Sequence, residues 1–559
     1  MFRQASQGRL HWAASRANIL QLETLQSLAG TLGGPGAGMP HLTDRRAIIK
    51  SGAALAAGAL AGGAAQRLMF PFIKDKLFAG RGENIILYVA DACRSDVIGK
   101  VIAGVEVTPN LNRLAVRGAW FSHCYAASNH TKPGMAAIIS GEPPPFTGVT
   151  WYARAIPRME TISVYLKAKG FSTGAVVTNP FLSGEKKKRH DERITVGFSN
   201  GYDRYAYLEA NDVVRDRSSR PIGLTAYVPD SVMLRTAMGM TSVNLSRRGA
   251  RVRPLRPPFF LQLHSMRTHA PYLGLGPNEF TGRFHPPELG RGGSAQDIFE
   301  EDWRFITWLR ENEDAALGQE ALARLAAVYY EAAAVMDRDF GRLLDMLAER
   351  GFYNERTRII FTADHGEALG GADKEVGHGK SLGEPALRVP LILSGGDVPA
   401  VEVSHRVPNF CILETLRSWF GDREPMSPSF ALDPRSLASH TPVYAAARRM
   451  AAHINEASSR KVIRREKGLS PAVYDVAGDP GEREALAAGV GEVEGLSRFE
   501  AYCDYCRRER GIEHVFSSHS WMVHEDKSLD ESEKAAAGSG QGGMTKQLES
   551  QLKALGYLN

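Results

Sequence analysis

Residues able to bind metal follow two strand-like segments of this sequence. Asp91 ends the apolar run Ile85–Ala90, and Asp364 and His365 follow Arg358–Thr362 within TADHGE. A carboxylate and an imidazole on one loop suit Zn, Mn or Fe better than calcium alone. Each feature has a simpler alternative when taken singly, because Asp91 could cap a helix and TADHGE could be a solvated loop.

Two further segments carry basic side chains. LQLHSMRTHAPY contains His264 and His269, and VGHGKSLGEPALRVP contains His378 and Lys380. Near a metal, such groups could bind the oxygens of an ester, and a histidine could protonate the leaving group. Any one of them alone is as readily explained as a surface or core residue.

Thr131 stands at the start of a predicted helix that ends at Gly141. A hydroxyl at this place is commonly an N-cap. A helix N-terminus also stabilises anions, and a metal would turn the hydroxyl into an activated nucleophile. Composition alone leaves both interpretations open.

The elements that must position these residues alternate between strand-like and helical patterns. Strands are predicted at Thr173–Val177 and Phe259–Leu263 besides the two above, and helices at Ile162–Lys169 and Leu322–Leu347. The alternation predicts an α/β fold with a doubly wound, mostly parallel sheet between helices. Active sites of such sheets lie at the carboxyl edge of the strands, where the candidate residues fall.

The pattern changes towards both ends of the chain. Residues 401–532 contain short segments typical of a smaller C-terminal subdomain with a sheet, and 533–559 read as a linker and a terminal helix. Residues 1–66 form an N-terminal extension that includes TDRRAIIK and an Ala/Gly-rich apolar run. That run predicts a twin-arginine-type signal, hence export to the periplasm or cell envelope, or else an uncleaved membrane anchor.

The charge of the chain argues against a nucleic-acid partner. The formal net charge is +6, and residues 1–76 alone hold nine Lys/Arg against three Asp/Glu. The remainder is therefore nearly neutral, whereas nucleic-acid binding needs a basic surface on the folded domain. The five cysteines are too few for a disulfide scaffold, and Cys503 and Cys506 are predicted to form either a zinc site or a disulfide.

The ordered blocks of this sequence resemble the sulfatase family of the alkaline phosphatase superfamily. The resemblance rests on NIILYVADACRSD, TPNLNRLAVRGAWFSHCYA, the Thr131 helix, PFFLQLHSMRTHAPY, TADHGEALG, HGKSLGEPALRVPLIL and VYDVAGDPGERE. It implies a catalytic domain over residues 83–400. It also implies that Asp91, Asp364 and His365 bind metal, that Thr131 is the nucleophile, and that His269, His378 and Lys380 surround the transferred group.

Two departures from the family pattern bear on the chemistry. Sulfatases carry Cys or Ser in a C/S-x-P-x-R motif that becomes formylglycine, whereas this chain has Thr131 and, in the arginine position, Met135. Ala92 replaces an acid common in calcium-binding sulfatases. The remaining set is similar to the single-metal site of lipoteichoic acid synthases and phosphoethanolamine transferases, which use threonine.

The resemblance therefore implies a hydrolase or transferase with one divalent ion, Mn, Zn or Ca, and a covalent threonine intermediate. The expected substrate is an anionic phosphodiester or phosphonate ester of a lipid head group, envelope polymer or glycan, with membrane-surface association in the first case. A sulfate ester is the chief alternative. A non-catalytic member that binds an anionic glycan or lipid is the contrasting hypothesis.

Overall fold

A computed structural model describes residues 84–487. It leaves out 148, 150–158, 184–196, 209–212, 216, 225–227, 229, 242–243, 246–250, 253, 288, 290–292, 313–314, 371–375, 405, 423–442, 448–449, 456–459, 465–469 and 480–481. The predicted signal, Cys503, Cys506 and the terminal helix lie outside the described residues. Within them, no helix is long and apolar enough to cross a membrane.

A nine-stranded sheet forms the centre of the molecule, in the order β16-β4-β15-β12-β1-β11-β5-β6, with β17 also paired to β4. All of its strands run in the same direction except β15, which is antiparallel to both of its neighbours. The strands are β1 Asn84–Ala90, β4 Ala119–Tyr125, β5 Ser172–Val177, β6 Arg204–Tyr207, β11 Phe259–Ser265, β12 Arg358–Thr362, β15 Arg388–Ser394, β16 Val401–Val403 and β17 Val407–Pro408.

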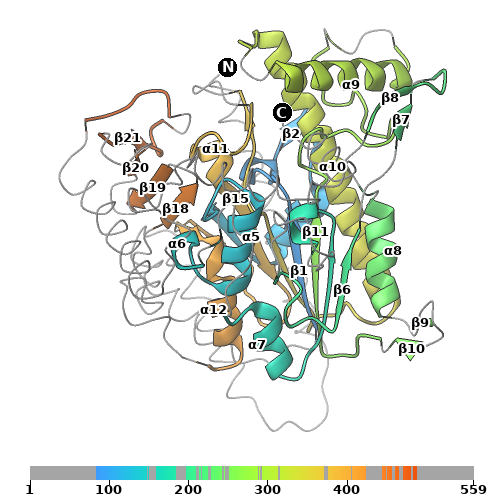
Figure 1. The fold of residues 1–559 in the computed structure, drawn as a ribbon, viewed down its shortest axis with the longest axis vertical. Helices are drawn as coiled ribbons and strands as arrows, with labels where there is room; N and C mark the ends of the chain where they lie inside the picture. Colours follow the sequence, from blue (N-terminus) through green and yellow to red (C-terminus); the bar gives the residue numbers. More distant parts are fainter. Residues whose placement is uncertain are drawn as a thin grey trace, which may run out of the picture.

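Helices cover both faces of this sheet (Figure 1). One layer contains α5 Thr131–Ser140, α7 Ile162–Ala168 and α12 Ile412–Trp419. The other contains α4 Pro109–Arg117, α8 Asp230–Met240 and the long α10 Gln319–Glu349, with α9 Ala295–Glu311 packed on α10. The predicted α/β architecture is confirmed.

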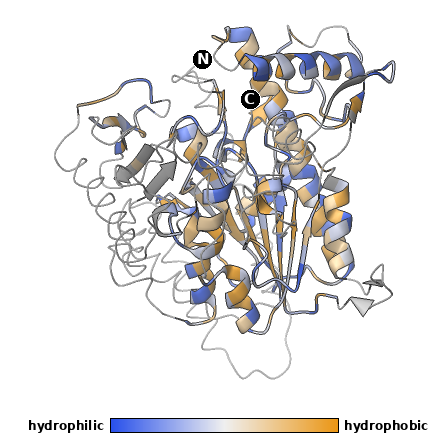
Figure 2. Cartoon of the chain, viewed as in Figure 1, coloured by the Kyte–Doolittle hydropathy of each residue, from blue (hydrophilic) through white to orange (hydrophobic). Residues whose placement is uncertain are grey.

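The central strands lie in the core of the molecule. Every residue of β1, β11 and β12 is buried, and the strands are predominantly apolar in Figure 2. Continuous apolar runs are typical of parallel strands covered on both faces, because neither face meets water. The sheet edge where these strands end is therefore held in place by the main core.

Short elements complete the described fold. They are η1 Ser95–Val97, β2 Val101–Ile102, β3 Val105–Glu106, α6 Pro144–Thr147, η2 Pro180–Leu182, β7 Val213–Arg215, β8 Pro221–Leu224, β9 Asn244–Leu245, β10 Arg251–Val252, β13 Ala368–Leu369, β14 Val376–Gly377, α11 Glu384–Leu387 and η3 Asn409–Cys411. Most of them connect strands of the main sheet with the helices that cover it.

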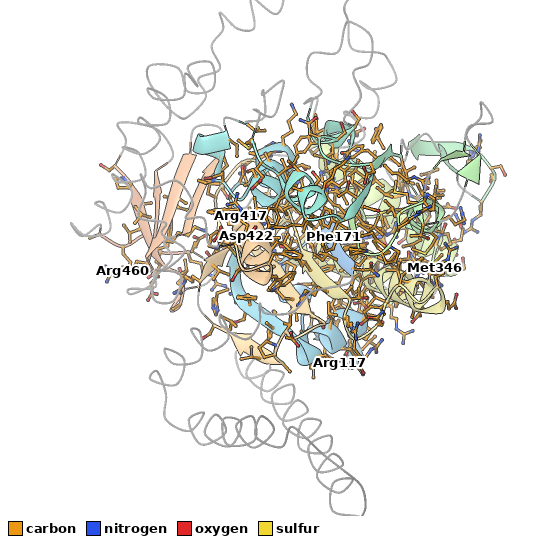
Figure 3. The ribbon with its side chains drawn as sticks, turned by 90° about the horizontal axis from the view of Figure 1, so that it is seen from below. Arg117, Phe171, Met346, Arg417, Asp422 and Arg460 are labelled. Carbon is orange, nitrogen blue, oxygen red and sulfur yellow. The ribbon has the colours of Figure 1, made fainter. Side chains whose placement is uncertain are left out.

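A second sheet follows the main one in the sequence. It is an antiparallel meander of β18 Val443–Ala447, β19 Met450–Asn455, β20 Arg460–Arg464 and β21 Ala472–Asp475. Figure 3 shows it to one side, at Arg460, with Phe171 and Arg417 over the main body. The main sheet continues past residue 400, where the sequence predicts a boundary, because β16 and β17 pair with β4.

The two sheets are joined by a buried ion cluster. Lys461 on β20 is fully buried, with its Nζ 3.2 Å from Glu384 of α11 and 2.9 Å from Glu482. Burial acts to lower the pKa of Lys461, but the two carboxylates raise it above its ordinary value, so the amine stays charged. The cluster thus fastens the second sheet to the loop that follows His378.

Candidate functional site

Three neighbouring strands bring carboxylates and a histidine to one edge of the sheet. In the parallel register, Val89 of β1 pairs with His264 of β11 on one side and Thr362 of β12 on the other. Asp91 and Asp364 each follow their paired residue by two positions, so they emerge at the same level as the end of β11. All three of Asp91, His264 and Asp364 are completely buried.

Helix α5 brings Thr131 to these residues. Thr131 is its first residue and is fully buried, and its Oγ1 lies 3.4 Å from Asp91 Oδ2 and 3.4 Å from His365 Nε2. Gly134 permits this approach, because a Cβ on it would lie only 2.4 Å from the carbonyl oxygen of Asp364. The helix N-terminus therefore points into the carboxylate and histidine cluster.

Asn179 is a member of the site that the sequence analysis missed. Its Nδ2 donates to Asp91 Oδ2 at 2.8 Å and lies 3.3 Å from Thr131 Oγ1. Asn179 also accepts a hydrogen bond from the backbone N–H of Phe181, which fixes the amide orientation. The signal was available, since Asn179 follows the predicted strand Thr173–Val177 at the same sheet edge as Asp91.

The buried donor set fits a divalent metal ion. Asp91 Oδ1, Asp364 Oδ2 and both ring nitrogens of His264 have no hydrogen-bond partner although they are buried. His264 Nε2 lies 3.7 Å from Asp91 Oδ2 and 3.5 Å from Asp364 Oδ2, and His365 Nε2 lies 3.4 Å from Asp91 Oδ1. Donors about 2.1 Å from one zinc-like ion would be separated by roughly 3 to 4 Å.

The charges of the site explain why a cation is needed there. Burial, followed by the charge of Asp364, raises the pKa of Asp91 to about 7. Burial would also raise the pKa of Asp364, but His365 and His264 hold it well below its ordinary value. Two carboxylates in a buried site repel each other, and a bound cation would compensate both.

A rim of histidines lies beside the candidate metal ligands. The ring centroid of His378 is 4.3 Å from that of His365, 4.7 Å from that of His269 and 5.6 Å from that of His130. Glu367, the last residue of TADHGE, accepts from His378 Nδ1 at 2.9 Å. The structure thus brings the predicted His269 and His378 together and adds His130 and Glu367 to them.

The hydrogen bonds of two histidines identify the ring nitrogen that carries the proton. The Nδ1 of His365 lies 2.8 Å from the Gly366 carbonyl oxygen, and that of His269 lies 2.8 Å from the Ala270 carbonyl oxygen. A carbonyl can only accept, so Nδ1 carries the proton and Nε2 keeps a lone pair. Burial lowers the pKa of His269 and of His378 to about 4, so both are neutral near pH 7.

Lys380 differs from the other predicted residues in its exposure. It lies on the exposed side of the loop that follows His378, while the preceding Gly379 approaches the His130 ring. Its role at the transferred group stays a prediction. His264, whose part the sequence left open, instead lies between the two buried carboxylates.

Comparison with known proteins agrees with this architecture. Residues 83–421 match the Sulfatase family. An arylsulfatase of Clostridium perfringens is 26% identical over 323 residues, covering 51% of this chain and 63% of the relative, so the match spans less than two thirds of that protein's length.

Two solved structures share the fold. The structure of BT4656 in complex with its substrate D-glucosamine-2-N,6-O-disulfate has a TM-score of 0.55 at 17% identity, covering 78% of this chain and 100% of that chain. The phosphonate monoester hydrolase of Agrobacterium radiobacter has a TM-score of 0.52 at 18% identity, covering 77% and 96%. With a family match over more than half of its length and this geometry at the strand ends, the chain belongs to the sulfatase family.

Proposed function

We propose that this protein is a metal-dependent ester hydrolase or transferase of the sulfatase family that forms a covalent ester on Thr131, with a phosphodiester or phosphonate ester as substrate. The observation that carries the proposal is the place of Thr131 Oγ1, 3.4 Å from both Asp91 and His365 inside the buried donor set. An N-cap hydroxyl would instead accept from the backbone of its own helix. Thr131 is the first helical residue, preceded by an extended His130 as the N-cap.

Asp91, Asp364, His365 and His264 would hold the divalent ion, with Mn, Zn and Ca as the candidates. Such an ion supplies Lewis-acid stabilisation of the transferred group and favours the ionised hydroxyl. The protein itself orients Thr131, through the Asn179 amide and the first turn of α5. Thr131 also lies at the positive end of the α5 dipole, which would stabilise an anion there.

The covalent step forms one bond and breaks another. Thr131 Oγ1 bonds to the phosphorus atom as the bond from phosphorus to the leaving oxygen breaks, and Asp91 Oδ2 lies within reach of the hydroxyl proton. In the second half, water or an acceptor alcohol attacks the same phosphorus, the bond from phosphorus to Thr131 Oγ1 breaks, and Asp91 can return the proton that restores the threonine hydroxyl. The neutral His269 and His378 can each accept the proton of that nucleophile.

The absence of formylglycine chemistry follows from two side chains. Threonine has a single hydroxyl and cannot become the aldehyde hydrate, so its ester is released only by attack at the phosphorus or sulfur. Met135 stands in the position of the family's arginine and is fully buried in the main apolar core. It therefore offers no cationic group to the transferred oxygens.

The proposed setting is the cell envelope. The twin-arginine-type segment motivates export, with the N-terminal segment as an alternative membrane anchor. There, lipid head groups, envelope polymers and glycans supply anionic esters. The solved structures similar in fold include BT4656 with its substrate, a disulfated glucosamine, and a phosphonate monoester hydrolase, so a sulfate ester is the alternative substrate class.

The decisive experiment combines turnover with mass spectrometry. Purified protein is loaded with Mn, Zn or Ca and incubated with aryl phosphodiester, phosphonate and sulfate esters, while product release and the mass of the Thr131 peptide are followed. Thr131→Ala removes the nucleophile. Ser140→Ala is the matched control, since it deletes a buried hydroxyl at the other end of the same helix.

The expected result is turnover of a phosphorus ester and a phosphoryl-sized or phosphonyl-sized adduct on Thr131. Thr131→Ala should abolish both, and Ser140→Ala should retain both. Preferred turnover of the sulfate ester would change the proposed substrate class to sulfate esters and leave Thr131 as the proposed nucleophile. Undiminished turnover in Thr131→Ala would refute the covalent mechanism, and no turnover with any metal would favour a non-catalytic anion-binding protein.

A further inference from the structure

A second cluster of metal-binding side chains lies away from the site described above. His285 belongs to the segment that follows β11, Asp302 lies on α9, and Glu331 lies on α10. Their side chains are 1%, 0% and 3% exposed. One donor atom of each lies within 4.8 Å of the others. The cluster therefore joins three separate segments deep inside the molecule.

The contacts within this cluster are not hydrogen bonds. His285 Nε2 lies 3.2 Å from Asp302 Oδ2 and 3.7 Å from Glu331 Oε1. Yet both ring nitrogens of His285 and Oδ2 of Asp302 lack any hydrogen-bond partner despite their burial. A histidine and a carboxylate left to themselves would form a hydrogen bond, whereas two ligands directed at one shared ion do not.

The separations agree with a common ion. Ligand atoms that lie about 2.0 to 2.1 Å from a tetrahedral zinc ion are about 3.3 to 3.4 Å from one another. The observed 3.2 Å and 3.7 Å bracket this value. One imidazole nitrogen with two carboxylate oxygens is also a donor set that zinc accepts, with a fourth position left for water.

Hydrogen bonds from neighbouring groups fix the orientation of the two carboxylates. Arg324 donates to the other oxygen of Asp302 at 2.8 Å, and the backbone N–H of Gly282 donates to Glu331 Oε1 at 2.6 Å. Secondary contacts of this kind orient metal ligands.

We infer that His285, Asp302 and Glu331 form a second, structural site for a divalent transition-metal ion of the zinc type. By binding all three residues, the ion would hold the segment after β11 against α9 and α10. Those elements also border the catalytic centre, because the same segment carries His269 and because Tyr329 of α10 bonds the Ala92 carbonyl beside Asp91. The second ion would therefore stabilise the wall of the catalytic site without touching the substrate.

Zinc content per chain tests this site in the full-length protein. Chelator-treated protein is reloaded with zinc, desalted and measured by native mass spectrometry and elemental analysis. An Asp364→Ala background removes a ligand of the catalytic centre, so the second site can be counted separately. His285→Ala is then added to that background, with Glu301→Gln as the matched control, an exposed neighbour of Asp302 on α9.

The expected contents are one zinc per chain in Asp364→Ala, one in Asp364→Ala with Glu301→Gln, and none in Asp364→Ala with His285→Ala. Zinc absent from Asp364→Ala, or equal contents with and without His285, would overturn the inference. Neither outcome depends on the Thr131 mechanism, because the count uses no substrate.

A second measurement covers the case in which His285→Ala fails to fold. Glu331→Gln keeps the size and shape of the side chain and removes its charge. In the metal-free protein with Asp364→Ala, this change should leave the thermal midpoint equal or higher, because it removes a buried carboxyl group that lies beside another. In the zinc-loaded protein with Asp364→Ala, Glu331→Gln should abolish most of the zinc-dependent rise in the midpoint, and a rise equal to that of Asp364→Ala alone would contradict the site.

Discussion

Gly134 offers a direct test of how α5 positions Thr131. An ideal Cβ on Gly134 would lie 2.4 Å from the Asp364 carbonyl oxygen, whereas Cβ atoms essentially never come closer than 3.0 Å. Gly134→Ala must therefore separate the first turn of α5 from Asp364 by at least about 0.6 Å. The Cβ atom would meet the buried backbone carbonyl group of Asp364, so no flexible side chain can move aside to absorb the shift.

The expected effect is much larger on activity than on stability. Misplacement of a reacting group by about 1 Å costs on the order of 100-fold in rate, so Gly134→Ala should lower kcat for an aryl phosphorus ester about 10-fold to 100-fold. The alanine also gains up to about 1 kcal/mol of helix propensity, and overpacking costs about 1 to 3 kcal/mol. The net loss of unfolding free energy should thus stay within about 2 kcal/mol.

The assay measures kcat and the free energy of unfolding side by side. Ala137→Gly is the control, because it lies in the same buried helix and lowers helix propensity without touching Asp364. It should change stability by about 1 kcal/mol and leave kcat within a factor of three. If Gly134→Ala retains the kcat of the unchanged protein, close packing against Asp364 does not set the position of Thr131.

Three other changes probe separate parts of the structure. Asn179→Leu removes the donor to the Asp91 carboxylate and should weaken metal binding by about 10-fold to 100-fold, which metal titration against a chelating dye would measure. Lys461→Met leaves Glu384 and Glu482 unpaired and should lower the unfolding free energy by about 3 kcal/mol, observable by urea titration. Asp96 has its pKa lowered below the ordinary value because the pairing with a guanidinium outweighs burial. Its stabilising contribution is present above pH about 4 and is lost as pH falls, so Asp96→Asn should flatten the acid limb of thermal unfolding.

The fold could be predicted because the main strands carry their own signal. Ile85–Ala90 is an uninterrupted apolar run and Arg358–Thr362 has an apolar centre, and the structure places them as neighbouring buried strands. Alternation with helical segments then leaves few arrangements other than a doubly wound sheet. The antiparallel β15 was not predictable in this way, because strand direction depends on pairing partners far away in the sequence.

The site was predictable where a residue directly follows a strand, and less so elsewhere. Asp91 and Asp364 were found by the sheet-edge rule. Asn179 also follows a strand at this edge, but its side chain is an amide, which no metal-binding or catalytic sequence pattern identifies. His285 and Glu331 lie on a loop and in the middle of a helix, and only the packing of three segments brings them together.

Strand register connects these observations to catalysis. His264 is the sixth residue of β11 and points to the edge where Asp91 and Asp364 emerge, because Val89 pairs with it in the parallel ladder. Side chains of a strand alternate between faces, so a slip of one residue would move His264 to the opposite face. The predominantly apolar β1 resists such a slip only weakly, since both of its faces are apolar. Asp91, Asp364 and His264 come together around a candidate cation site in the observed register. These buried polar groups therefore help to select a register that the apolar core alone leaves less defined.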